Sequence, residues 1–312
     1  MMNDYKNVVA KKCVECFCWA LKIFLIKRKQ PRTFYQYSTI SAFKGVIEGN
    51  NLWATHWAYL NDAKELKRGI EIAHIVFARI KQIERFSSNS DYFSVLEKYV
   101  SKLDSSIPFN VDVYVLCFSE VKDRLSLWRG YGNGYNSVVI GYDADDLEIN
   151  ENNFGLPLIG KVIYNEDEQK KMMLMYLVRY YEMIEELHKI FPKQKREIEK
   201  IMKRFFLVGI LILSLFIKEK CWKEEKEWRM IFLNPDIDFL DFKVTDNGLI
   251  PFIKVPIFKD HAIKCIKNVC LPKSSNFALR EKAVKMLWNK FCNKNDIKKD
   301  LKVKESSISI VY

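Results

Sequence analysis

The sequence predicts an α+β fold with a helical block inserted into a β-rich domain. Strand and helix patterns alternate irregularly along the 312 residues, without the regular strand–helix–strand order of a doubly wound parallel sheet. A long helical stretch at about 168–218, interrupted near Pro192, separates the earlier predicted strands from the later ones. We therefore expect an N-terminal helix over 1–33 and a single α+β domain over 34–312 that carries this insertion.

The first half of the chain contains the clearest helix signal. Asp62 can cap a helix, and Glu65 follows three residues later, which together form a capping box ahead of an apolar face. Residues 111–119 are rich in β-branched and aromatic side chains, as in a buried strand. The other predicted elements here are helices at 1–30, 40–48, 92–103 and 125–131 and strands at 34–37, 52–55 and 137–142.

Gly130, Gly132 and Gly134 form a G-x-G-x-G pattern just before a predicted strand. A dinucleotide-binding loop joins a strand to a helix, so the order found here favours a hairpin turn at Asn133-Gly134. After this turn, the sequence predicts helices at 168–191, 195–218 and 277–293 and strands at 161–164, 228–233, 239–243, 249–255, 265–271 and 307–311.

Composition and charge indicate in which compartment the protein works and what kind of partner it binds. No signal-peptide pattern begins the chain, and the two longest apolar runs, 16–26 and 205–217, are too short to span a bilayer. We expect a cytoplasmic protein without stable membrane insertion, and an interfacial or partner-binding role for 16–26 stays open. The net charge of +12 favours nucleic acid or another polyanion. AT-rich bacterial proteins are often rich in lysine and carry a similar charge without binding nucleic acid. The charge alone therefore does not decide whether nucleic acid is a partner.

The cysteines and histidines do not form a metal-binding pattern. Cys13, Cys16 and Cys18 lie together, but no second cysteine or histidine pair follows at finger-like spacing. We expect reduced cysteines that act as small buried apolar side chains, and no metal.

Residues 224–229, Glu-Glu-Lys-Glu-Trp-Arg, have two competing interpretations. In an extended segment, Glu225, Glu227 and Arg229 share one face, and such a group suits chemistry on a cationic or oxocarbenium-like centre. The same residues also fit a solvated helix end with pairs between Lys220 and Glu224 and between Lys223 and Glu227.

Four short motifs occur in a specific order, although each motif alone is weak. They are Phe34-Tyr35-Gln36-Tyr37-Ser38, then Leu52-Trp53-Ala54-Thr55 with Leu60-Asn61-Asp62-Ala63-Lys64-Glu65, then Cys117-Phe118-Ser119-Glu120 with Leu127-Trp128-Arg129-Gly130-Tyr131-Gly132, and Glu224-Glu225-Lys226-Glu227-Trp228-Arg229. The ordered set is similar to a large bacterial family of unassigned function, often encoded near mobile elements and phage-defence genes. The similarity spans residues 34 to about 312.

That family resembles the ADP-ribosyltransferase superfamily in turn. The resemblance implies a split, mixed or antiparallel β core with a central cleft, and a toxin or abortive-infection role in which NAD is the substrate and a macromolecule, such as nucleic acid, accepts ADP-ribose. It implies that Tyr35, Gln36, Tyr37 and Ser119 bind NAD. Gln36 departs from the pattern, because many members carry Arg or His on the first strand.

The resemblance assigns catalysis to Glu227 or Glu225. A carboxylate such as Glu227 can hydrogen-bond the ribose and stabilise developing positive charge, while Glu225 can orient or deprotonate the acceptor. The planar guanidinium group of Arg129 can bind the pyrophosphate of NAD. Alternatively, it stacks on Trp128 and only stabilises the fold. Tyr35 and Tyr37 equally fit ordinary core packing.

Two rival functions remain open. One is a non-catalytic nucleic-acid-binding or regulatory module, in which the acidic residues hold the core together. The other is a nuclease that uses Glu225, Glu227 and Asp62 around a divalent metal.

Overall fold

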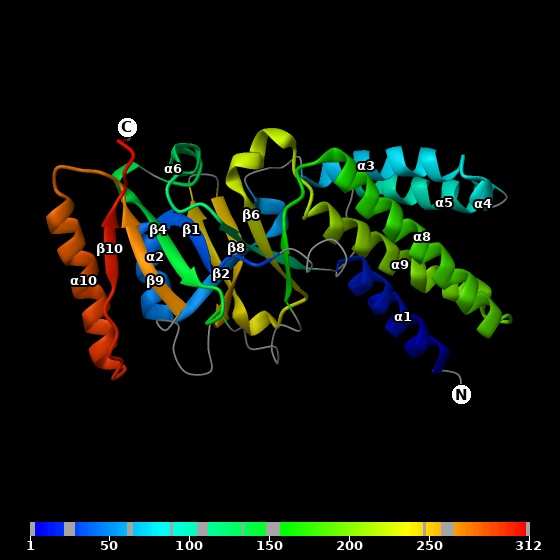
Figure 1. Cartoon of the computed structure of the whole chain (residues 1–312). Coiled ribbons are helices and arrows are strands. Elements are labelled where there is room, and N and C mark those ends of the chain that lie inside the picture. Colours follow the sequence, from blue (N-terminus) through cyan, green and yellow to red (C-terminus); the bar gives the residue numbers. More distant parts are fainter. Residues whose placement is uncertain are drawn as a thin grey trace. The chain divides into compact units, whose positions relative to one another are not determined.

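The computed structural model describes residues 4–21, 29–60, 65–87, 90–104, 112–132, 134–147, 157–245, 248–256 and 265–309. The chain forms two compact units, each built from three separate segments (Figure 1). Unit 1 contains 1–28, 61–111 and 160–223, and unit 2 contains 29–60, 112–159 and 224–312. Helices make up most of unit 1, whereas unit 2 contains nearly all of the sheet.

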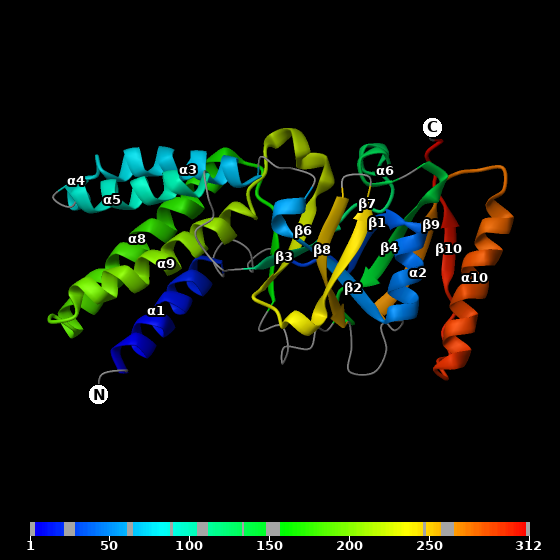
Figure 2. The ribbon, with the colours of Figure 1, turned by 180° about the vertical axis from the view of Figure 1, so that it is seen from behind.

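Unit 1 is a group of helices that pack through apolar faces. α1 packs on α8 and α9, and α3 packs on the same two helices (Figure 2). Asn165 begins α8 by accepting a hydrogen bond from the Glu168 amide, and three acidic residues follow in the first turn, where they suit the helix dipole. The helices are α1 (Asp4–Leu21), α3 (Glu65–Ile80), α4 (Glu84–Ser87), α5 (Ser90–Val100), α8 (Glu166–Ile190) and α9 (Lys195–Ser214).

The predicted helices at 168–191 and 195–218 correspond to α8 and α9. α1 occupies part of the predicted N-terminal helix. The capping box predicted at Asp62 and Glu65 involves residues outside the described ranges, so only the helix that follows it is seen, as α3.

Unit 2 contains a large open mixed sheet, so the chain is a mixed α/β protein. β9 and β10 run parallel, whereas the pairs that join β9, β4, β1, β3, β2, β8 and β7 in sequence are antiparallel. The sheet order is β10 (Lys302–Glu305), β9 (Ile266–Leu271), β4 (Ser137–Asp143), β1 (Thr33–Thr39), β3 (Val113–Ser119), β2 (Asn51–His56), β8 (Gly248–Pro256) and β7 (Leu240–Thr245), and β6 (Glu227–Leu233) pairs with β3 and β5 (Leu158–Lys161).

Three strands pair with β3 within this single sheet. One edge of β3 pairs with β6 over its full length. The other edge is shared, since β1 pairs only at Ser119 and β2 pairs only at Tyr114 and Val115. β1 and β2 therefore diverge from one another along the same edge of β3, and α2 (Ile40–Gly49) connects them.

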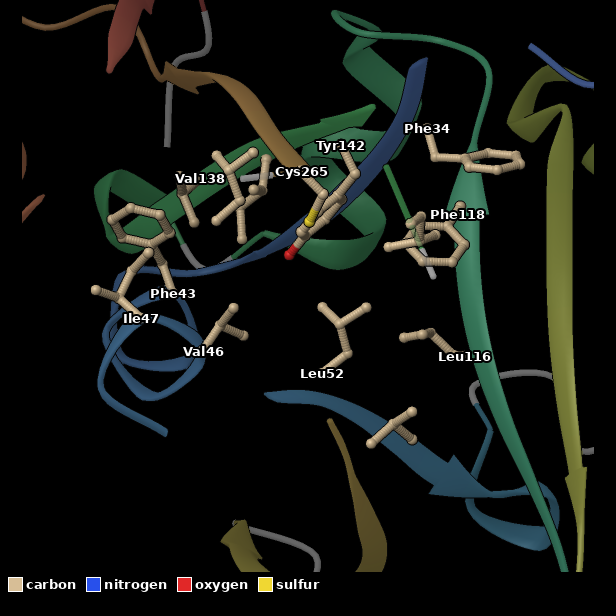
Figure 3. Close-up of a cluster of buried hydrophobic side chains, with 14 of the residues drawn as sticks. Phe34, Phe43, Val46, Ile47, Leu52, Leu116, Phe118, Val138, Tyr142 and Cys265 are labelled. Atoms are coloured by element: carbon tan, nitrogen blue, oxygen red, sulfur yellow. The ribbon is translucent and has the colours of Figure 1, made fainter. Parts of the chain in front are cut away.

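The main core of unit 2 lies on one face of this sheet. α2 begins at Thr39, whose hydroxyl accepts a hydrogen bond from the Ala42 amide, and it buries Phe43, Val46 and Ile47. Figure 3 shows these side chains directed toward apolar residues of the strands. The strand residues in this cluster include Phe34, Leu52, Leu116, Phe118, Val138, Tyr142 and Trp228, and α10 (Phe277–Lys294) adds Val284, Trp288 and Cys292.

A smaller apolar cluster covers the opposite face. It consists of Trp128, Val139 and Cys270, with the partly buried rings of Tyr35 and Tyr37 packed against it. Trp128 comes from α6 (Leu125–Tyr131), which follows β3 in the chain.

Three local predictions differ from the structure, and one of them is β5, which forms at Leu158–Lys161 instead of 161–164. The G-x-G-x-G segment does not join two strands as a hairpin: it leads from α6 into a 3₁₀ turn at Gly134–Asn136 and then into β4, while Asn133 lies outside the described residues. A strand forms at Lys302–Glu305, where it pairs with β9, whereas 307–309 are not in a strand and the rest of the predicted strand at 307–311 lies outside the described residues. In the ranges that the structure describes, no helix is long and apolar enough to cross a membrane.

Candidate functional site

Three of the predicted site residues lie in one row across adjacent strands. Tyr35 of β1 is the register partner of Ser119 of β3, and Ser119 is in turn the partner of Glu227 of β6. Residues directly opposite in a sheet project to the same face, with neighbouring Cβ atoms about 5 Å apart. The fold therefore brings together side chains that are far apart in the sequence. We call Tyr35, Ser119 and Glu227 the polar row.

Glu227 is a buried carboxylate held by an arginine on the same strand. Arg229 Nε lies 2.8 Å from Glu227 Oε1, and Arg229 Nη2 lies 3.0 Å from Oε2. Their exposures are only 4% for Glu227 and 1% for Arg229, which excludes the solvated helix end for this pair. Two parallel charge-assisted hydrogen bonds fix the orientation of the carboxylate.

Glu225 is also buried, but it does not belong to the strand. It ends a 3₁₀ helix at Lys220–Glu225, and Lys226 then takes a left-handed conformation with φ of 43° before β6 begins at Glu227. The expected extended arrangement from Glu225 to Arg229 is therefore wrong at its first residue. Glu225 Oε1 accepts a hydrogen bond of 2.8 Å from the Tyr131 hydroxyl of α6.

Ser119 fastens the end of β3 to the start of β6. Its hydroxyl donates to the Glu225 carbonyl at 2.6 Å and accepts from the Val121 amide at 2.9 Å. The Glu120 amide also donates to the Lys226 carbonyl. These bonds hold the left-handed turn that separates Glu225 from Glu227.

Tyr37 and Gln36 have structural partners. The Tyr37 hydroxyl donates to the Val121 carbonyl and accepts from the Arg124 amide, both at 3.1 Å. Burial raises the pKa of Tyr37, so the neutral hydroxyl is retained. Gln36, next in the strand, projects to the opposite face, where its Oε1 accepts a hydrogen bond from the buried Tyr142 hydroxyl. The structure thus separates Gln36 from the polar row.

α6 is anchored by Asp123, which the sequence did not single out. This carboxylate accepts hydrogen bonds from Trp128 Nε1 at 2.7 Å, from the Ser306 hydroxyl at 2.7 Å, and from the amide and hydroxyl of Ser307 at 2.8 Å each. Burial alone would raise the pKa of Asp123, but these hydrogen bonds lower it. Trp128 is fully buried and meets the Tyr37 ring edge to face, whereas Arg129 is exposed on α6.

The comparisons with known proteins bear on part of this region. Residues 127–230 match a family model described as a protein of unknown function, DUF2971. The match includes Arg129, Glu225 and Glu227 and excludes Tyr35 and Ser119. No curated protein and no solved structure matches the chain.

The site can combine a fixed buried carboxylate with an aromatic ring. Tyr35 is half-buried beside the Trp128 cluster, and its ring lies one strand from Ser119 and two strands from Glu227. A carboxylate in such a low-dielectric place stabilises a nearby positive charge more strongly than it would in water. Within the described ranges, no group of three or more histidine, cysteine or acidic side chains is positioned to hold a metal ion.

Proposed function

We propose that this protein transfers ADP-ribose from NAD to a macromolecule. The observation that supports the proposal is the polar row, in which an aromatic residue of the first strand, a serine of a middle strand and a glutamate of a late strand are register partners. These residues are among the positions that the resemblance to the ADP-ribosyltransferase superfamily points to, namely residues 35–37, Ser119 and either Glu225 or Glu227. Their alignment across three strands places the three side chains close enough to act on one ligand.

In this proposal Glu227 acts on the ribose that joins nicotinamide to the rest of NAD. The bond between ribose and nicotinamide breaks, and its electron pair leaves with the nicotinamide nitrogen. The positive charge that develops on the ribose is stabilised by Glu227, which Arg229 holds in place through both carboxylate oxygens. Tyr35 would pack its ring against the nicotinamide.

Glu225 would orient the acceptor and remove its proton as it attacks the ribose. Tyr131 positions this carboxylate through its hydroxyl. The net charge of +12 supports a polyanionic acceptor such as nucleic acid. The toxin or phage-defence role is part of the same proposal and rests on the resemblance of the motifs.

A second candidate is supported by the same ion pair. Glu227 and Ser119 both have internal partners, which is what a non-catalytic module would need if these polar groups served only to join β3 and β6. In that case the carboxylate stabilises the fold, and binding of nucleic acid would not depend on its charge.

The two candidates differ in the response of Glu227→Gln. Pure protein is incubated with labelled NAD and total cellular RNA, DNA and protein, and nicotinamide release and label transfer are measured. For a transferase we expect the folded fraction of Glu227→Gln to react about 10²–10³-fold more slowly than the wild type. Glu224→Gln is the matched control, because Glu224 is exposed and adjacent in sequence.

Two outcomes would contradict the transferase. One is the absence of nicotinamide release from the wild-type protein with every acceptor fraction. The other is equal rates for the wild type and Glu227→Gln. Nucleic-acid binding that is equal in the wild type and in folded Glu227→Gln, without nicotinamide release from either protein, would support the non-catalytic module.

A further inference from the structure

The polar row continues beyond Tyr35 on the side away from Glu227. Tyr35 is the register partner of Gly141 in β4, and Gly141 is the partner of Asn268 in β9. Asn268 is in turn paired with Lys302 of β10, whose side chain is exposed. One face of the sheet therefore presents Glu227, Ser119, Tyr35, Asn268 and Lys302 in line, with a glycine between Tyr35 and Asn268.

Gly141 leaves room for the side chain of Asn268. A Cβ atom at position 141 would lie 2.9 Å from both Nδ2 and Oδ1 of Asn268. Real Cβ contacts are essentially never that close, so the amide occupies space that any other residue at 141 would fill. The Asn268 amide thus lies over β4, on the side of Asn268 that faces Tyr35.

The Asn268 amide also has unused hydrogen-bonding capacity. Its Oδ1 is buried and has no hydrogen-bond partner in the ranges of the chain that are described. Native proteins leave few buried acceptors unpaired, because an unpaired buried acceptor is destabilising. The terminal torsion of asparagine is broad, so the amide can turn to present its oxygen and nitrogen to a ligand on this face.

We propose that Asn268 binds the adenine base of a nucleotide. An asparagine amide is complementary to the edge of adenine, because Oδ1 accepts from the exocyclic N6 amine while Nδ2 donates to N7. Hypoxanthine carries an oxygen at that exocyclic position, so it cannot donate to Oδ1. The chain would therefore distinguish the two bases through a residue outside the predicted motifs.

The distance between Glu227 and Asn268 indicates that Asn268 lies where the adenine base of NAD would bind. This step rests on the proposed function, in which Glu227 acts at the ribose next to nicotinamide. Asn268 is four strands away from Glu227, or about 19 Å along the sheet. A group so far from the breaking bond belongs to the other end of NAD, which is adenosine.

Lys302 is placed to act on the nucleotide without recognising its base. Lys302 is the register partner of Asn268 and its side chain is exposed, and Lys304 lies two residues further along the same face. A lysine in this position attracts phosphate as a point charge, whatever base the nucleotide carries. Asn268 and Lys302 therefore make different and separable contributions to binding.

The test compares the binding of AMP and IMP to the full chain by calorimetry. We expect wild-type protein to bind AMP more tightly than IMP by about tenfold, and Asn268→Ala to abolish this preference. Lys302→Ala is the matched control: it should weaken both nucleotides equally and leave their ratio unchanged. Asn268→Leu, of similar shape, provides a second variant, and both Asn268 variants should stay folded because an unpaired acceptor is removed.

Two results would overturn the adenine site: no binding of AMP by the wild type at millimolar concentration, or an AMP-to-IMP ratio that does not change in the Asn268 variants. Neither measurement requires NAD to be cleaved. An unchanged ratio together with NAD cleavage that depends on Glu227 would refute the adenine site alone. A ratio that depends on Asn268 without nicotinamide release would leave the adenine site standing and refute the transferase.

Discussion

The two faces of β1, β3 and β6 are stabilised by different forces, although the same three strands make both. On one face Phe34, Phe118 and Trp228 pack ring against ring, with centroids 5.2 Å apart for the two phenylalanines and 5.6 Å for Phe34 and Trp228. Each of these aromatic residues is adjacent in sequence to a member of the polar row on the other face. These members are Tyr35, Ser119 and Glu227.

The difference shows that a polar face is not automatically a reactive one. Apolar packing is non-directional and tolerates small shifts, whereas each hydrogen bond on the polar face requires a defined partner. Ser119 and Tyr37 use their hydroxyls to hold backbone, and Glu227 is held by Arg229. The candidate chemistry therefore depends on groups that also hold the strand ends together.

The largest expected effect comes from removing Arg229. Arg229→Ala leaves the Glu227 carboxylate buried without its bidentate partner, and breaking a buried pair in this way costs about 3–5 kcal/mol. We expect the free energy of unfolding, measured by urea denaturation, to fall by that amount. Arg124→Ala is the control, since its contact with Glu224 is exposed and 3.9 Å long, and it should cost less than about 1 kcal/mol. Equal losses in the two variants would mean that the polar face does not depend on this pair.

A smaller, pH-dependent effect is expected at Asp123. Asp123→Asn should lower the free energy of unfolding by about 2 kcal/mol at neutral pH, because charge-assisted hydrogen bonds from Trp128, Ser306 and Ser307 are weakened. The folded-state pKa of Asp123 is lower than its usual value of 3.8, so this stability is present above that value and is lost as the pH falls through the folded-state pKa. The curves of the variant and the wild type should converge in acid.

The control for this pH dependence is Asp146→Asn, because Asp146 is exposed. Its acid limb should follow that of the wild type. A gap between wild type and Asp123→Asn that stays constant from neutral to acid pH would show that the charge of Asp123 does not anchor α6.

The smallest expected effect is the difference in stability loss between variants of the two tyrosines of β1 on the polar face. Tyr37→Phe removes two hydrogen bonds to the segment after β3 and should cost about 1–2 kcal/mol, whereas Tyr35→Phe should cost about 0.5 kcal/mol or less. Burial raises the pKa of Tyr37, so its contribution is complete below pH 10 and is lost as the pH rises further. Tyr37→Phe should therefore flatten the alkaline limb of thermal unfolding. An equal loss of stability in both variants would show that the Tyr37 hydroxyl stabilises the fold no more than the Tyr35 hydroxyl does.

Much of the fold follows from local sequence patterns. The apolar run of 111–119 is β3, and the predicted helix at 40–48 is α2, because periodicity and propensity agree in both. The left-handed turn at Lys226 was not predicted, since Ser119 and Glu120 hold it from a distant part of the chain. Asn268 could not be predicted for a related reason: it lies in line with Tyr35 only through β4, and a single asparagine in a strand gives no signal by itself.

The pairing of β3 with β6 has a consequence for how the chain folds. Glu120 and Trp228, joined by a hydrogen bond at this pairing, are 108 residues apart in sequence. Closing a loop of that size early has a large entropic cost, and folds dominated by such distant pairings form slowly. Among the intervening residues, 25 belong to α8 and 20 to α9, and the hydrogen bonds within these helices are local. Helix formation before sheet closure would shorten the effective loop, so the sheet that carries the polar row should be the last part of the chain to become ordered.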